Sequence, residues 1–311
     1  MKINPFIHRI LFLSSIILLG ITSCTTEKKS QAPAANSFTF TFLTDIHVQP
    51  EKNAMQGLQQ AIDSVNKINS DFVITGGDLI MDALGQRYSR ADSLYNIYTG
   101  MIKGFKMPVY NTMGNHEIWG WYKESGADTT NPEFGKKMFE KRIGPLYQAF
   151  EHKDWKFFLL NSVQKNGTGG YMGTIDTLQR AWIREELSRT PADIPIVIST
   201  HIPFITTEAQ IFGGSLKPNS AWETIANSKE VLALFKNHNL KLVLQGHLHF
   251  YEYMYVFGTT YITGGSVAAS WWEGPYYGTE EGFLVVKVNG EKFSWEYKDY
   301  GWNVKKVMSD E

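Results

Sequence analysis

Five of the eight histidines in this sequence follow directly after short apolar runs, each beside a small or polar residue. Carboxylate and amide side chains occur at the same kind of position. Such a series is typical of residues that meet where several buried strands end. The positions concerned form five groups along the chain: Asp45 with His47, Asp78, Asn115 with His116, His201, and His247 with His249.

Mixed sets of imidazoles and oxygen donors bind zinc, iron or manganese rather than calcium, which takes oxygen ligands alone. Two such cations about 3.5 to 4 Å apart neutralise the oxygens of a phosphate ester and lower the pKa of a water molecule. Each motif by itself is weak, because a histidine at a strand end is more often a hydrogen-bonded structural residue and Gly-Asn-His-Glu can form a turn. Together they indicate a two-cation site that acts on a phosphate ester.

The segment that ends at Asp78 shows how such a side chain is presented. Residues 72–74 form an apolar run that is typical of a strand covered on both faces. Gly76 and Gly77 then remove two side chains at the point where the backbone must turn. We therefore expect Asp78 at the end of a buried strand, with open space around its carboxylate.

Strand and helix signals alternate along the rest of the chain. Residues 38–42 alternate apolar and polar side chains, and apolar residues recur every three or four positions over 55–68. Strand–helix–strand units of this kind form parallel sheets with functional groups at the carboxyl ends of the strands. We predict further strands over 107–112, 155–160, 194–200 and 240–244, helices over 94–105, 178–187 and 231–235, an irregular insertion with some helix over 119–149, and an antiparallel tail sheet over 251–302.

Residues 1–24 differ in kind from the rest of the chain. Lys2 and Arg9 precede the apolar run 10–21, which is shorter than the roughly 20 residues that span a bilayer. This layout predicts an export signal, and the four residues that end at Cys24 resemble the bacterial lipobox, in which the cysteine is lipid-modified. The alternative is an ordinary secreted protein that is cut near an unmodified cysteine. We therefore predict an exported lipoprotein, anchored at Cys24 to the bacterial cell envelope and facing the periplasm or the surface.

The remaining residues divide into a tether and a single domain. Residues 25–37 are small and polar and have no apolar periodicity, as in a flexible tether. The stretch 38–311 contains no repeat, low-complexity tract or linker, and we predict one domain. With 30 basic and 31 acidic side chains the net charge is −1, which leaves no electrostatic footprint for nucleic acid. No nucleic-acid polymer is therefore expected as a partner.

In their order along the chain, these motifs resemble the full motif set of the calcineurin-like metallophosphoesterases. The similarity covers roughly residues 38–265, and the Asp-x-His opening resembles the class III cyclic nucleotide phosphodiesterases. The resemblance implies an α/β fold in which two mixed β-sheets pack as a sandwich flanked by helices. The motifs that carry it are Asp45-Ile-His47, Gly77-Asp78, Gly114-Asn-His-Glu117, His201 and Gly246-His-Leu-His249.

The resemblance also implies a role for each residue. Two ions of manganese, iron or zinc are expected, the nucleophile would be a hydroxide that bridges them, and His116 would face the phosphate and assist the leaving group. Asn115 and Asp78 would belong to the catalytic group as well, and Asn115 and His116 would contact the substrate. The implied ligands are Asp45, His47 and His249 for the first ion, Asn115, His201 and His247 for the second, and Asp78 as the bridge.

Two positions depart from the family pattern. Many members have an aspartate three residues after the bridging one, where it orients the catalytic histidine. Here that position is Met81 and the carboxylate follows at Asp82, so the sequence does not show which group orients His116. Glu117, where many members have aspartate, is interpreted as structural.

Aromatic residues also lie beside the motifs. Trp119, Trp271, Trp272 and Tyr276 could stack on a base or sugar of the substrate at the rim of the site, or could simply fill space between loops and sheet.

The leading hypothesis is a metal-dependent phosphoesterase whose substrate is a phosphodiester or phosphomonoester of a small molecule, a lipid or a glycan. The alternative is a surface binding protein that retains the metals and hydrolyses nothing. A serine hydrolase is disfavoured, because the sequence contains no Gly-x-Ser-x-Gly motif.

Overall fold

The computed structural model of the chain describes residues 36–304. The predicted export signal 1–24 with its Cys24, and nearly all of the predicted tether, lie outside the described residues. Within 36–304, no helix is both long enough and apolar enough to cross a membrane.

The first sheet has five strands, in the order β13 (Lys292–Asp299), β12 (Gly282–Asn289), β1 (Phe38–Leu43), β2 (Phe72–Thr75) and β3 (Val109–Asn111). Strands β1, β2 and β3 are parallel, whereas β12 is antiparallel to both β1 and β13. Leu43 pairs with Thr75, so β1 and β2 end level with each other. The residues that follow these two strands therefore meet at one edge of the sheet.

The second sheet has six strands, in the order β10 (Tyr251–Val256), β11 (Thr259–Gly264), β9 (Asn239–Gln245), β8 (Pro195–Thr200), β5 (Trp155–Leu160) and β4 (Gln148–His152). Its four inner strands are parallel, and both edge strands are antiparallel to their neighbours. Thr200 pairs with Gln245, so β8 and β9 also end level with each other.

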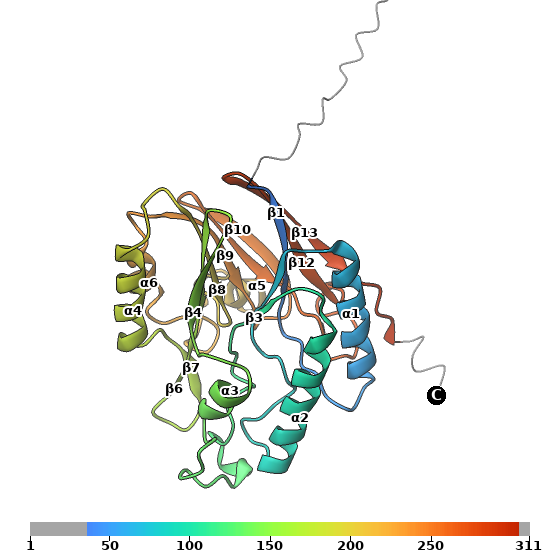
Figure 1. Ribbon diagram of the computed structural model, residues 1–311. Helices are drawn as coiled ribbons and strands as arrows, with labels where there is room; N and C mark the ends of the chain where they lie inside the picture. Colours follow the sequence, from blue (N-terminus) through green and yellow to red (C-terminus); the bar gives the residue numbers. More distant parts are fainter. Residues whose placement is uncertain (1–35, 305–311) are drawn as a thin grey trace, which may run out of the picture. The chain divides into compact units, whose positions relative to one another are not determined.

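The two mixed sheets pack face to face (Figure 1). Between them lies an apolar layer that is rich in aromatic rings. The alternating residues of β1 explain this layer, because its phenylalanines point toward the second sheet. Phe40 stacks on Phe72 with ring centroids 5.2 Å apart, and the edge of Phe157 meets the ring of Phe40 at 5.6 Å. This layer holds the two sheets together and leaves their strand ends free to carry the site.

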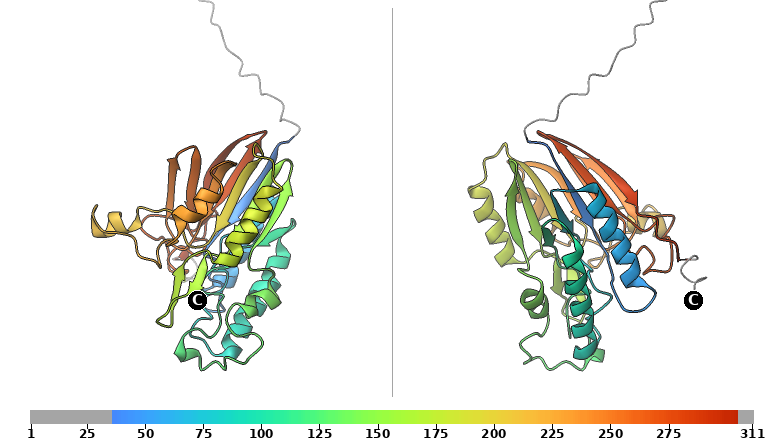
Figure 2. Two further views of the ribbon diagram at one scale, coloured as in Figure 1. Left: turned by 90° about the vertical axis from the view of Figure 1, so that its left-hand side faces the viewer. Right: turned by 45° about the vertical axis from the view of Figure 1, so that its right-hand side comes forward.

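Helices lie outside the sandwich, with α1 (Ala54–Ile68) and α2 (Tyr88–Met101) beside the first sheet and α4 (Thr177–Ser188) and α6 (Ser228–Leu234) beside the second (Figure 2). Most of the predicted stripe of α1 is buried, including Leu58, Ile62 and Val65, whereas Met55 at its start is exposed. Asp176 caps α4 by accepting a hydrogen bond from the amide of Gln179. Shorter helices are η1 (Ile102–Gly104), η2 (Lys123–Ser125), α3 (Lys137–Arg142) and α5 (Glu208–Gly213).

The tail differs from the predicted separate antiparallel sheet. Strands β10 and β11 extend the second sheet, where β11 is parallel to β9, whereas β12 and β13 extend the first sheet. An edge strand exposes unpaired backbone groups, and each half of the tail pairs with one such edge. The tail therefore completes both sheets of the sandwich.

Two strand pairings were not predicted. The insertion 119–149 contains helix as expected, but it leads into edge strand β4, whose side chains are mostly half-buried. A two-stranded hairpin of β6 (Val163–Lys165) and β7 (Tyr171–Gly173) follows β5. Three-residue strands are too short to show an alternating pattern, so the sequence carried no signal for the hairpin.

Candidate metal centre

The candidate residues of all five motif groups converge at the carboxyl ends of parallel strands from both sheets. Asp45 and His47 follow β1, Asp78 follows β2, and Asn115 follows β3. From the second sheet, His201 follows β8 directly, and His247 and His249 follow β9. Six of these seven side chains are buried, and His247 is half-buried. The parallel arrangement thus brings together residues that are up to about 200 positions apart in the sequence.

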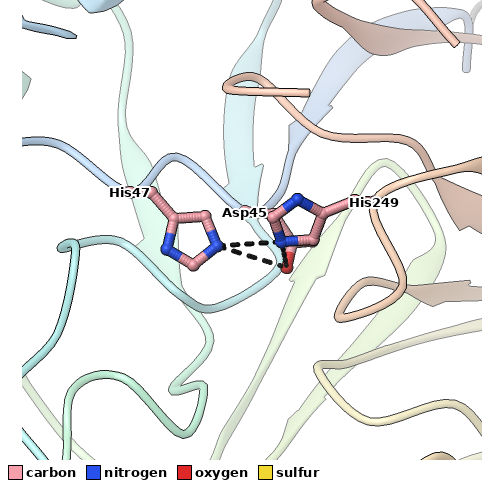
Figure 3. Close-up of side chains that lie close together, drawn as sticks. All are labelled: Asp45, His47 and His249. Carbon is pink, nitrogen blue, oxygen red and sulfur yellow. Dashed lines mark hydrogen bonds and ion pairs between the residues drawn. The ribbon is translucent and has the colours of Figure 1, made fainter. Parts of the chain in front are cut away.

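Asp45, His47 and His249 form the first donor set (Figure 3). The Nε2 atoms of His47 and His249 lie 2.9 Å apart, and Nε2 of His249 lies 3.4 Å from Oδ1 of Asp45. Nδ1 of His249 donates to the carbonyl of Ala269 at 2.6 Å, which leaves the Nε2 lone pair directed at its neighbours. Three electron-pair donors therefore face a common point.

Asn115, His201 and His247 form the second donor set. Nε2 of His201 lies 3.1 Å from Oδ1 of Asn115 and 3.2 Å from Nδ1 of His247. The outward nitrogens donate to backbone carbonyls, from His201 Nδ1 to Gly76 at 2.9 Å and from His247 Nε2 to Trp222 at 2.9 Å. These bonds select the tautomers whose lone pairs point inward.

Asp78 lies between the two sets. Its Oδ2 is 3.1 Å from Nε2 of His201 and 3.9 Å from Nε2 of His47, which belong to different sets. Its Oδ1 accepts a hydrogen bond from the amide of His116 at 2.9 Å. This carboxylate therefore lies within 4 Å of a ring from each set.

The backbone of the site is held in left-handed conformations that residues with a side chain rarely adopt. The φ angles of Asp45, His47, Asp78, His247 and His249 lie between 46° and 76°. Adjacent glycines leave room for the donors: a Cβ on Gly77 would lie 2.6 Å from the His201 ring, and one on Gly114 would lie 2.2 Å from Oδ1 of Asp78. The glycines of the Gly-Gly-Asp and Gly-Asn-His motifs are therefore required by close packing around Asp78.

Glu117 fixes the loop that carries Asp78. Its Oε1 accepts the amides of Leu79 at 2.7 Å and Ile80 at 3.2 Å, and its Oε2 accepts those of Asp78 at 3.0 Å and Gly114 at 2.7 Å. The side chain is fully buried, and burial together with Asp78 raises its pKa to about 7. This arrangement agrees with the structural role that the sequence suggested for Glu117.

We expect the Glu117→Gln substitution to destabilise the protein by about 2–6 kcal/mol, because a glutamine Nε2 cannot accept hydrogen bonds and leaves two buried amides unpaired at about 1–3 kcal/mol each. Urea unfolding of the metal-free protein would measure the change. The matched control is Glu124→Gln, which alters an exposed carboxyl. Equal unfolding midpoints for the two variants would contradict the structural role of Glu117.

His116 is oriented by a backbone group rather than by a carboxylate. Its Nδ1 donates to the carbonyl of Met81, whereas Oδ1 of Asp82 lies at 3.5 Å. The Asp82 carboxylate instead accepts the amide of Leu84 at 3.1 Å. Nε2 of His116 lies 3.7 Å from Oδ2 of Asp78. The carbonyl of Met81 therefore supplies the orientation that the sequence left open.

The pKa values of the buried site residues decide which of them must lose a proton when a cation binds. Burial and His201 lower the pKa of His247 to about 3, so this ring is neutral at pH 7 and offers a lone pair. Burial opposes protonation of His201, but Asp78 and Asp45 raise its pKa to about 9. Burial also opposes ionisation of Asp78, yet His201 and His116 hold its pKa well below the usual 3.8. A cation that binds at His201 must displace a proton, so its affinity falls as the pH falls.

The donor set as a whole fits two cations. Within each set, imidazole nitrogens face one another and a carboxylate or amide oxygen at 2.9 to 3.4 Å. Their lone pairs repel one another unless a proton or a positive ion lies between them. Their chemistry suits zinc, iron or manganese.

A pocket of about 250 Å³ opens beside the two donor sets. Trp271 lines it, with its ring centroid 4.5 Å from that of His249.

The expectation that Trp119 and Trp272 contact substrate is wrong: their side chains are 3% and 1% exposed and belong to the apolar core. Trp272 lies against Gly57 and donates to the carbonyl of His47, so it supports the site from behind.

Tyr276, which the sequence placed with Trp271 at the rim of the site, also lines the pocket. Three further residues of the pocket were not predicted from the sequence. They come from the segment between β8 and α6 and from the β6–β7 hairpin, where no motif marks a site. The aromatic character of Tyr171 and Trp222 was a signal, but it does not distinguish a pocket wall from core. The three residues are Tyr171, Glu208 and Trp222.

The sandwich of two mixed sheets, with its cluster of histidine, aspartate and asparagine at the strand ends, is the architecture of metallo-dependent phosphatases. Residues 38–251, more than half of the chain, match the family model described as calcineurin-like phosphoesterase. The chain belongs to that family, as its motifs predicted. No curated protein gives a significant match.

Solved structures share the fold at low sequence identity. A dimetal phosphatase from Danio rerio aligns with a TM-score of 0.62 and 14% identity, over 87% of this chain and 98% of its own. GAP50 from Plasmodium, described as the anchor in the inner membrane complex, aligns with a TM-score of 0.54 and 15% identity, over 85% of both chains. At these identities the likeness establishes the fold alone, and it confirms the predicted fold class.

Proposed function

We propose that the protein is a binuclear metal-dependent phosphoesterase that hydrolyses a phosphodiester or phosphomonoester. The observation that carries this proposal is the position of Asp78 between two sets of inward-facing donors. A single set would fit one cation, whereas two sets that share a carboxylate fit a pair. The proposal assigns Asp45, His47 and His249 to one ion, Asn115, His201 and His247 to the other, and Asp78 to both. Manganese, iron or zinc would suit these ligands.

When bound, two such cations neutralise phosphate oxygens and lower the pKa of water so that it attacks at neutral pH. The residues of the chain supply the rest. In the reaction the oxygen of water bonds to phosphorus, the bond from phosphorus to the alcohol oxygen breaks, and the alcohol leaves with a proton. Nε2 of His116 lines the pocket and is placed to donate that proton or a hydrogen bond. Asn115 adds an amide group that can contact the phosphate.

Metal removal tests the function. We expect the purified protein to contain two transition-metal ions per chain and to hydrolyse bis(4-nitrophenyl) phosphate or 4-nitrophenyl phosphate. Dialysis against a chelator should abolish this turnover, and adding manganese or zinc should restore it. Elemental analysis and release of 4-nitrophenol measure the two properties. A fully metallated protein that hydrolyses neither ester contradicts the proposal.

The second candidate is a binding protein that holds the metals without hydrolysis. The observation in its favour is that a protein of the same fold is described as an anchor in a membrane complex. Turnover by the metallated protein separates the two candidates.

For the cellular location, we propose export and lipid attachment at Cys24, supported by the signal-like sequence of residues 1–24. The substrate would then be a small-molecule, lipid or glycan phosphate ester outside the cytoplasm. A Cys24→Ala variant should leave the membrane fraction, and its retention there would argue against the anchor.

A further inference from the structure

The pocket beside the donor sets has one wall that the proposed chemistry does not use. Two long connecting segments outside the sheets form this wall. One connects β8 to α6 and includes Glu208, at the start of α5, and Trp222. In the left view of Figure 2 it projects from the sheets. The other connects β11 to β12 and includes Trp271 and Tyr276. Together, Glu208, Trp222, Trp271 and Tyr276 form the outer wall of the pocket.

The outer wall carries negative charge. Burial and the neighbouring Glu223 raise the pKa of Glu208 to about 7. Burial opposes ionisation of Glu223, but the hydrogen bond from the amide of Ser220 holds the pKa of Glu223 below its usual value, so the pair retains at least one negative charge. Glu223 is 4% exposed, and Oε2 of Glu208 is buried without a hydrogen-bond donor among the described residues. Glu252 adds a further carboxylate nearby, held by the amide of Thr207 at 2.9 Å. Lys217 is the cation that acts on Glu208.

The rest of the outer wall consists of aromatic rings. Trp222 lines the pocket and is 51% exposed. Trp271 and Tyr276 meet edge to face, with ring centroids 6.0 Å apart and planes at 82°. Both rings are half-buried. Aromatic faces beside a carboxylate form the usual environment for an organic cation, because the ring quadrupole and the negative charge act together.

The lining of the pocket has no strongly basic side chain that would bind a second anionic group. Among its lining residues, all of them within the described part of the chain, there is no lysine or arginine. The larger cleft of about 710 Å³, lined in part by the 119–149 insertion, is different, since Lys123 and Lys165 line it. A second phosphate or carboxylate near Glu208 would therefore meet the negative charge of the Glu208–Glu223 pair and no lysine or arginine of the pocket lining.

We propose that the outer wall is a subsite for an organic cation, and that the substrate is a phosphate ester whose alcohol carries a quaternary or protonated amine. The Glu208–Glu223 pair supplies the charge, and Trp222 and Tyr276 supply the aromatic faces. The inference rests on the proposed function, because it places the phosphate at the donor sets next to this wall. It adds a substrate class to that function.

Two esters that differ only in charge test the proposal. 4-Nitrophenyl phosphorylcholine has a trimethylammonium group where its isostere, 4-nitrophenyl 3,3-dimethylbutyl phosphate, has a neutral tert-butyl group. For the metal-loaded full chain we expect kcat/KM to be about tenfold or more higher for the cationic ester, as an accessible cation–π contact beside a carboxylate would give. The ratio of the two values is the readout, because it cancels general effects on catalysis. Equal values would overturn the proposal.

Variants locate the preference in the outer wall. Glu208→Gln should reduce the ratio to about one third or less of its value, and Trp222→Leu should do the same through loss of the aromatic face. Glu291→Gln is the matched control, since it removes an exposed carboxylate in the β12–β13 turn, at the end of the first sheet away from the site. An unchanged ratio in both wall variants would refute the assignment, even if one of them folded poorly.

A binding measurement separates this inference from the proposed function. Isothermal titration of the metal-loaded protein with phosphocholine and with 3,3-dimethylbutyl phosphate needs no turnover. Tighter binding of phosphocholine by about tenfold, lost in Glu208→Gln, supports the subsite whether or not the protein is an enzyme. Failure to hydrolyse any ester, together with this binding, would reject the phosphoesterase alone. Hydrolysis of bis(4-nitrophenyl) phosphate without any preference for the cation would reject the subsite alone.

Discussion

Replacing Asp78 with asparagine should lower phosphoester hydrolysis by about 10³-fold or more, because the charge stabilisation lost is several kcal/mol and about 1.4 kcal/mol corresponds to tenfold. The side chain is 2% exposed, and its carboxylate lies 3.1 Å from His201 and 3.9 Å from His47. Asparagine keeps the shape of the carboxylate but removes the charge that the two donor sets share. We therefore expect the metal content to fall from two ions per chain toward one or none.

The measurement for Asp78→Asn combines elemental analysis with kcat/KM for bis(4-nitrophenyl) phosphate. Asp71→Asn is the matched control, because this carboxylate is also paired, with Lys153 at 3.0 Å and His152 at 3.2 Å, but lies before β2 rather than after it. Its activity should stay within about twofold of the parent protein, since partly exposed ion pairs contribute little. A fully metallated and active Asp78→Asn protein would remove the basis of the two-cation proposal.

Replacing His116 with glutamine should have the second largest effect. Unlike Asp78→Asn, it should leave the metal content unchanged. We expect kcat to fall by about 10²- to 10⁴-fold, the usual contribution of a positioned acid, while both ions are retained. His116 belongs to neither donor set in the proposal, and its Nδ1 is engaged by the carbonyl of Met81. The loss should be larger for an alkyl ester than for a 4-nitrophenyl ester, because 4-nitrophenolate leaves without needing a proton.

Asp82→Asn provides the comparison for His116. Since the carbonyl of Met81, rather than Asp82, orients the ring, this variant should lose about tenfold or less. Parallel assays of both variants with alkyl and 4-nitrophenyl esters measure the difference. If His116→Gln loses its metals, His116 is a ligand instead, as its position near His47 and Asp78 would also allow. If Asp82→Asn is as damaging as His116→Gln, the carboxylate is the orienting group.

Much of this site was predictable because its signals are local. Each donor follows an apolar run, and the parallel arrangement of such runs places their ends at one edge. The glycines at 77 and 114 were visible in the sequence, and the structure shows that they are needed next to Asp78 and His201. The roles of the donors as metal ligands remain predictions, to which the structure adds their convergence.

Other features could not be predicted, because they depend on backbone groups from distant segments. No pattern in the sequence shows that the carbonyls of Met81, Trp222 and Ala269 accept hydrogen bonds from the rings of His116, His247 and His249. The sequence also could not show which of three similar tryptophans reaches the site. Trp271 borders the pocket, whereas Trp119 and Trp272 are buried. Burial of an aromatic ring is set by the segments that pack around it.

The sequence by itself determined the family and the fold class and marked the candidate metal ligands, because strand periodicity, glycine positions and donor types are properties of short segments. Tertiary structure decided how the tail strands divide between the two sheets, which group orients His116, and which residues form the outer wall. These features arise where chain segments far apart in sequence meet. These features are stabilised by the pairing of edge strands, by backbone hydrogen bonds between segments and by the burial of side chains where segments pack together. None of these interactions is contained in a single segment.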